Sequence, residues 1–118
     1  MRIVSFGYTA DALLSGRKTV TRRKWKGDWL KVGDEAQAWD KGPHRGGKRV
    51  GTIKVLSVQA ETWPLALERD AEAEARREGF MSPAEWAQVS AKSGLKEGDR
   101  IVRLEFAFTP APTPESAR

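Results

Sequence analysis

The sequence predicts one small α+β domain built on a mixed or closed β-sheet. Three observations lead to this prediction. The chain has 118 residues, a usual length for one domain with one core. Five segments have the alternation or β-branched composition of strands, and helix-forming segments lie between them. Cysteine is absent, which excludes disulfides and thiolate metal sites and leaves a packed core to stabilise the domain.

The N-terminal half is expected to consist mainly of strands. Residues 2–6 carry β-branched and aromatic side chains and predict a first strand. A short helix is expected at 10–15, with Thr9 as its N-cap and Gly16 at its C-terminal left-handed position. Three further strands, separated by a Trp-containing loop and a Gly/Pro-rich basic loop, are predicted at 18–24, 35–40 and 49–60.

The C-terminal half changes to helical patterning. Residues 65–78 are rich in Ala, Glu and Arg and predict a helix that ends at Gly79. A second helix is expected to begin after Ser82, with Pro83 in its first turn and Glu85 completing a capping box. The last strand is predicted at 100–108. The expected organisation is therefore a single domain over 1–108 and a disordered Pro-rich tail over 109–118.

Positive charge is concentrated in one part of the sequence. The formal net charge is +5, and residues 16–54 hold twelve Lys and Arg against four Asp and Glu. Residues 61–99 hold five against nine. Such a basic half favours an anionic partner such as a nucleic acid. The alternative is a solvated surface on which the two signs are separated by chance.

The most basic segment is 16–24, which has five cations and two hydroxyls in nine residues. In an extended strand Val20 points to one face, while Thr21 and Arg23 point to the other. The apolar face can join a core while the other presents hydroxyls and a guanidinium. This division predicts the floor of a cleft for an anion or a nucleotide.

Several short motifs follow one another along the chain: Gly16-Arg-Lys-Thr-Val-Thr-Arg22, the turn at 30–34, Gly51-Thr-Ile53, Ala75-Arg-Arg-Glu-Gly-Phe80 with Glu85-Trp86, and Gly98-Asp99. Taken together, they resemble an ASCH domain of the PUA-like superfamily. The resemblance covers about residues 3–108 and depends on the order and spacing of the motifs. It implies a small mixed β-barrel of about five to six strands with two or three flanking helices, and a cleft that binds RNA or a nucleotide.

One branch of the family consists of amidohydrolases that deacylate N4-acetylcytidine and related nucleosides. The resemblance implies catalytic roles for Lys18, Thr21 and Glu78. In the predicted helix Glu74 lies one turn before Glu78 and is an alternative for its role. A threonine is a poor nucleophile until a base takes its proton, and a lysine is such a base only if its pKa is lowered. Lys18 and Thr21 lie three apart, so they converge only if Gly16 turns the chain before the strand begins.

The function expected first is binding of RNA or a nucleotide in a basic cleft floored by residues 16–24, and the amidohydrolase is the alternative. Further alternatives are a ribonuclease and a protein-interaction module in translation or transcription control. Lys18 and Thr21 are equally compatible with a solvated cation and a strand-forming residue. Residues expected to contact RNA or a modified nucleoside are Arg17, Thr19, Arg23, Trp39, Arg45, Lys48 and Arg49.

No metal or cofactor is expected, since no cluster of ligands is visible and the chain has a single histidine. No apolar run is long enough to span a membrane. The expected setting is the cytoplasm, and the expected state is a monomer or weak dimer.

Overall fold

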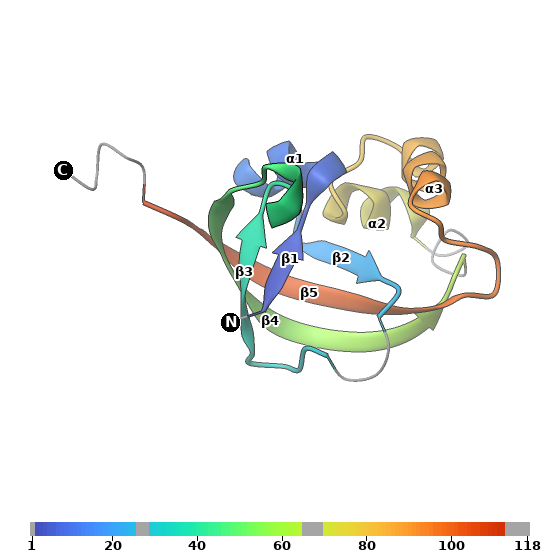
Figure 1. Ribbon diagram of the computed structural model, residues 1–118. Helices are drawn as coiled ribbons and strands as arrows, with labels where there is room; N and C mark the ends of the chain where they lie inside the picture. The colour runs from blue at the N-terminus through green and yellow to red at the C-terminus, as the bar shows by residue number, and fades with distance from the viewer. Residues whose placement is uncertain (1, 26–28, 65–69, 113–118) are drawn as a thin grey trace.

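The computed structural model describes residues 2–25, 29–64 and 70–112, and its centre is a five-stranded sheet (Figure 1). One pair, β1 with β3, is parallel, and the other three pairs are antiparallel. The two longest strands, β4 and β5, curve beneath the others, so the sheet curls into a half-barrel. The predicted α+β fold is confirmed. The strands, in spatial order, are β1 (Ile3–Ser5), β3 (Glu35–Trp39), β4 (Arg49–Thr62), β5 (Arg100–Pro110) and β2 (Val20–Arg23).

Three α-helices accompany the sheet in the described residues. Figure 1 shows α2 and α3 next to each other beside β2, whereas α1 lies closer to β1 and β3. Two 3₁₀ turns, η1 before α1 and η2 between β3 and β4, complete the connections. The bounds are η1 (Gly7–Thr9), α1 (Ala10–Leu14), η2 (Pro43–Arg45), α2 (Ala71–Arg77) and α3 (Pro83–Lys92).

Some boundaries differ from those expected. The basic strand is limited to Val20–Arg23, because the Thr19 amide donates to the carbonyl of Arg77, the last residue of α2. The predicted helix over 65–78 begins at Ala71, and 65–69 lie outside the described residues. The last strand continues to Pro110, because Thr109 pairs with Thr52 on β4. Of the expected disordered tail, 113–118 lie outside the described residues.

The core has two parts, and β5 contributes to both. Ile101 packs among residues of α2 and α3, whereas Leu104 and Phe106 pack against the other cluster. Strand alternation explains this division, because odd and even positions face opposite sides of the sheet. The first cluster includes Val4, Phe6, Leu13, Ala36, Ala38, Ile53 and Val55. The second includes Trp63, Ala75, Phe80 and Trp86.

The start of α3 follows the predicted capping pattern. Ser82 is extended, and its Oγ accepts a hydrogen bond of 3.1 Å from the Glu85 amide. The Glu85 carboxylate accepts from the amide of Met81, one residue before the cap. A serine N-cap of this kind stabilises a helix by about 1 kcal/mol. It fixes the first turn of α3, which carries Trp86 into the second cluster.

Candidate active site

A cavity of about 260 Å³ lies beside β2, which is an edge strand of the sheet. Its walls come from the segment after β1, from β2, from the end of α2 and from α3. Hydroxyl, cationic, acidic and aromatic side chains all face it. Those central to its chemistry are Phe6, Lys18, Thr21, Arg22, Arg23 and Glu78.

Lys18 reaches this cavity because the chain turns before the strand begins. Gly16 has a φ of +82°, a left-handed conformation that glycine adopts without steric cost. The Lys18 amide still donates to the Ala12 carbonyl of α1, at 3.1 Å. Strand pairing starts only at Val20, so strand alternation does not apply to Lys18. Lys18 and Thr21 therefore line the same cavity.

Lys18 and Glu78 form a buried ion pair. The Lys18 Nζ lies 3.1 Å from Glu78 Oε1 and 2.6 Å from the Glu78 carbonyl oxygen, and the two residues are 3% and 5% exposed. Burial lowers the pKa of Lys18 to about 8; Glu78 opposes this change, and the nearby Arg23 and Arg22 add to it. An amine with such a pKa is partly neutral close to physiological pH and can accept a proton.

Thr21 is buried and accepts a hydrogen bond from its neighbour on the same face. Arg23 Nε donates to Thr21 Oγ1 at 2.9 Å, and Arg23 Nη2 donates to the Ser5 carbonyl oxygen at 2.7 Å. Because the hydroxyl oxygen accepts from a guanidinium, its own proton is free to be donated elsewhere. The cation also favours negative charge that develops near this oxygen.

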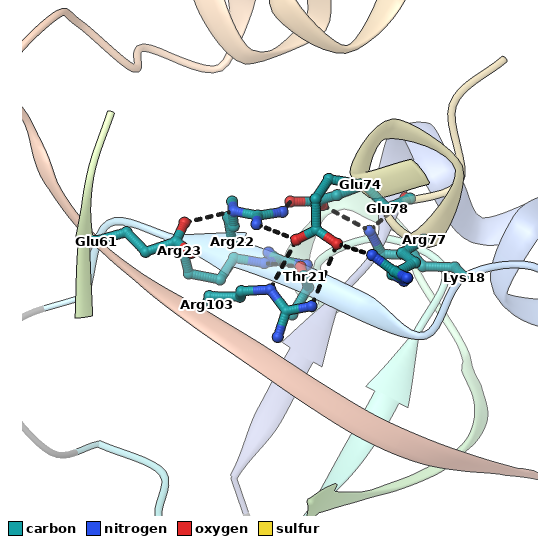
Figure 2. A network of polar contacts seen from close by, with 9 residues as sticks. All are labelled: Lys18, Thr21, Arg22, Arg23, Glu61, Glu74, Arg77, Glu78 and Arg103. Atoms are coloured by element: carbon teal, nitrogen blue, oxygen red, sulfur yellow. Dashed lines mark hydrogen bonds and ion pairs between the residues drawn. The ribbon is translucent and has the colours of Figure 1, made fainter. Parts of the chain in front are cut away.

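Arg22 points to the other face of β2 and binds three carboxylates. Figure 2 shows its guanidinium between Glu61 on one side and Glu74 and Glu78 on the other. Nε lies 2.8 Å from Glu61, Nη1 lies 3.1 Å from Glu78 Oε2, and Nη2 donates to Glu74. The guanidinium carbon also lies 5.0 Å from the centre of the Trp86 ring. Arg22 therefore connects the cavity to a second group of charges.

That second group is centred on Glu74. Its carboxylate accepts from Arg22, Arg77 and Arg103, and it borders a separate groove of about 710 Å³. Burial acts to raise the pKa of Glu74, but hydrogen bonds from Arg103, Arg22 and Arg77 outweigh it and hold the value at about 2. Of the two candidate carboxylates, only Glu78 is among the described residues that line the smaller cavity.

The structure brings together four of the residues expected to form the site: Lys18, Thr21, Arg23 and Glu78. The other expected ligand contacts are not among the described residues lining this cavity. Arg17 contacts Ser15 and the Met81 sulfur, and the Trp39 indole donates to Gln37. The remaining four, Thr19, Arg45, Lys48 and Arg49, are exposed.

Sequence reasoning missed two residues of the site. Arg22 belongs to the basic motif, but its three carboxylate partners come from β4, from α2 and from the residue that ends α2, and leave no local pattern. The sequence did contain one signal. Alternation puts Arg22 on the same face of the strand as the apolar Val20, and a charge on a buried face needs a partner. Trp86 packs with residues of α2 in the second cluster and also lines the cavity.

Two further findings apply to the described residues. Among them, no group of three or more His, Asp or Glu side chains is arranged to hold a metal ion. Nor does any helix in this part of the chain have the length and apolarity needed to cross a membrane.

Comparison with solved structures shows the fold of ASCH domains. The ASCH protein of Zymomonas mobilis matches with a TM-score of 0.61 and 16% identity over 92% of this chain and 68% of that chain. The ASCH domain of Lactobacillus crispatus matches with a TM-score of 0.62 and 19% identity over 88% and 72%. A protein from Enterococcus faecalis matches with a TM-score of 0.60 and 17% identity over 91% and 73%.

No family model matches the sequence, and no curated protein matches it significantly. The solved structures alone confirm the predicted resemblance to ASCH domains, at the level of fold.

Proposed function

We propose that this ASCH-fold domain binds a nucleoside in the cavity beside β2 and hydrolyses an amide bond to its base, as in N4-acetylcytidine. One observation carries the proposal: Lys18, Thr21 and Glu78 line a single cavity, with Lys18 and Glu78 in contact. A hydroxyl, an amine whose pKa is about 8 and a carboxylate are the groups that nucleophilic acyl transfer needs.

The chemistry proceeds in two stages. Neutral Lys18 takes the Thr21 proton as Oγ1 bonds to the acyl carbon, and the carbonyl electron pair moves onto oxygen. When that pair returns, the carbon–nitrogen bond breaks and the departing amine takes the proton from Lys18. Water then attacks the acyl-threonine ester, giving its proton to Lys18 or Glu78. The Thr21 hydroxyl is regenerated and a carboxylic acid leaves.

Charge and size support a nucleoside over a polymer for this cavity. Each cation that lines it already has an internal partner, so a ligand phosphate would have to compete with these contacts. Its volume, about 260 Å³, lies just below the ~300 Å³ lower end of pockets for drug-sized ligands. The pairs are Lys18 with Glu78, Arg22 with three glutamates, Arg23 with Ser5 and Thr21, and Lys24 with Asp99.

The test is to incubate the protein with N4-acetylcytidine and follow the release of cytidine. We expect Thr21→Ala and Lys18→Ala each to lower kcat/KM by about 10³-fold or more. Thr19→Ala is the matched control, because Thr19 belongs to the same motif but its exposed side chain does not line the cavity. Its activity should equal that of the wild type. Intact-mass measurement should detect an acetyl group on Thr21 during turnover.

Two results would contradict the proposal. One is cytidine release that is no faster with the protein than without it, over a panel of N4-acylated cytidines. The other is wild-type activity in Thr21→Ala, because no other hydroxyl is assigned the role of nucleophile.

RNA binding is a second candidate function, supported by a different surface. The segment between β3 and β4 presents Arg45 and Lys48 to solvent, and Trp39 is partly exposed next to it. Cations with a neighbouring aromatic side chain suit a single strand, by phosphate contact and base stacking. We expect single-stranded RNA to bind at low salt and to weaken as salt rises. Arg45→Ala with Lys48→Ala should reduce the salt dependence, and no binding at low salt would exclude this function.

A further inference from the structure

Arg22 has a guanidinium whose nitrogens are each committed to a different carboxylate. Nε binds Glu61 of β4, Nη2 binds Glu74 of α2, and Nη1 binds Glu78 at the end of α2. Its side chain is 2% exposed, and the Trp86 ring of α3 packs against its face. A planar group with three fixed partners and a covered face has one available orientation.

That orientation determines how Glu78 meets Lys18. Because Arg22 Nη1 holds Glu78 Oε2, only Oε1 is directed to Lys18 Nζ. Without the Arg22 contact, the carboxylate could rotate and give its full negative charge to Lys18. The fixed arrangement divides that charge between an arginine and a lysine (Figure 2).

We propose that Arg22, clamped by Glu61 and Glu74, is a positioning residue that fixes the Glu78 carboxylate so that a single oxygen of it reaches Lys18. The clamp leaves Lys18 weakly paired and able to give up its proton. The need for Lys18 as a base rests on the proposed function, but the clamp itself is measurable without any substrate.

The charged groups around Lys18 come from two elements. Glu78 at the end of α2 raises its pKa, whereas Arg22 and Arg23 of β2 lower it. The Phe6 ring, 5.9 Å from Nζ, covers another side. Gly79, which carries no charge, lies beside its stem, since a Cβ built there would be 3.5 Å from the Lys18 Cβ. Arg22 lowers this pKa in two ways, by its own charge and by holding part of Glu78.

The experiment is to titrate Lys18 by NMR in the full chain, using the shift of its side-chain Cε or Nζ. The test variant is Arg22→Lys, which keeps the charge but has one ammonium that cannot reach three carboxylates at once. We expect the Lys18 midpoint to rise from about 8 by about half a pH unit or more. An unchanged midpoint in folded Arg22→Lys would overturn the proposal, since charge alone would then account for the effect.

Arg103→Lys is the matched control. Arg103 also binds Glu74 and lies next to the same groove, but no contact joins it to Glu78. The Lys18 midpoint should therefore stay at its wild-type value. A rise as large as that in Arg22→Lys would mean that any change near Glu74 perturbs Lys18, and would also overturn the proposal.

The wild-type protein supplies a measurement that does not depend on a variant folding. A guanidinium held by three carboxylates should show separate, slowly exchanging signals for its Nη protons. A single averaged signal for Arg22 would contradict the clamp. These readouts are independent of turnover, so a protein that fails to deacylate nucleosides but shows the expected titrations loses only the proposed function.

Discussion

Glu74 and Glu78 lie one helical turn apart at the end of α2, yet their surroundings differ in kind. Glu74 accepts from three arginines and has a pKa of about 2. Glu78 is more deeply buried, at 5% against 8% exposed, but shares its charge with one arginine and with Lys18, a cation that can lose its proton. The difference separates two tasks: Glu74 holds β2, β5 and α2 together, and Glu78 keeps a titratable pair next to the cavity.

The largest effect is expected from removing either carboxylate and comparing the losses. Glu74→Ala should lower the free energy of unfolding by about 3 to 5 kcal/mol, because Arg22 and Arg103 lose a buried partner. Glu78→Ala should cost about half as much. Arg22 then retains Glu61 and Glu74, and Lys18 can become neutral. Urea unfolding at pH 7 measures both, and equal losses would remove the distinction.

The second-largest effect on stability is expected from acid, which protonates Glu74. The pKa of Glu74 falls from its ordinary 4.5 to about 2 on folding, so its stabilisation is present above pH 4.5. It is lost as pH falls from 4.5 toward 2, by about 3 kcal/mol in total. The measurement is the unfolding free energy as a function of pH. In Glu74→Gln this part of the dependence should be missing; parallel curves for variant and wild type would show that other carboxyls cause it.

A substitution next to Glu78 should lower the stability by a smaller amount. Gly79 has a φ of +99°, and a Cβ there would lie 2.7 Å from the Ala12 Cβ. Gly79→Ala should therefore cost about 2 to 3 kcal/mol and disturb the Lys18–Glu78 pair. Gly94→Ala is the control, because Gly94 has a φ of +94° but a Cβ there would meet no atom within 4 Å. It should cost only the backbone strain, about 1 kcal/mol, and thermal unfolding that ranks the two in reverse order would contradict this account.

The smallest expected effect is an increase in stability. Folding lowers the pKa of Lys18 from 10.5 to about 8, so the folded state disfavours the charged amine. That penalty is complete below pH 8 and disappears as pH rises to 10.5. Lys18→Met should thus raise stability by about 1 kcal/mol at pH 7, with the gain shrinking above pH 8. Destabilisation at pH 7 would show that the contacts with Glu78 outweigh the cost of burial.

The order and type of the elements could be predicted, because they depend on local patterns. In the strand predicted at 35–40, alternation puts Ala36 and Ala38 on the same face, and both are buried. Ser82, Pro83 and Glu85 predicted the start of α3 correctly. Strand ends were less predictable. β2 begins only after Thr19 because a carbonyl of α2, far away in sequence, takes the Thr19 amide.

The choice between the two glutamates could not be made from the sequence. Residues four apart share one face of a helix, so Glu74 and Glu78 look equivalent in the helical pattern. Their difference comes from partners on other elements: Arg103 on β5 for Glu74, and Lys18 before β2 for Glu78. Arg22, which joins the two, has contacts 39, 52 and 56 residues away in sequence.

The position of β2 at the edge of the sheet has a consequence for association between molecules. An exposed strand edge offers unpaired backbone groups to other chains, and short, charged edge strands resist such pairing. β2 has four residues, two of them arginines. Three of these four residues, Val20, Thr21 and Arg22, are buried, and α2 packs against the strand. Covering an edge in this way limits pairing with another chain, so a substitution that separates α2 from β2 would both open the cavity and expose the edge.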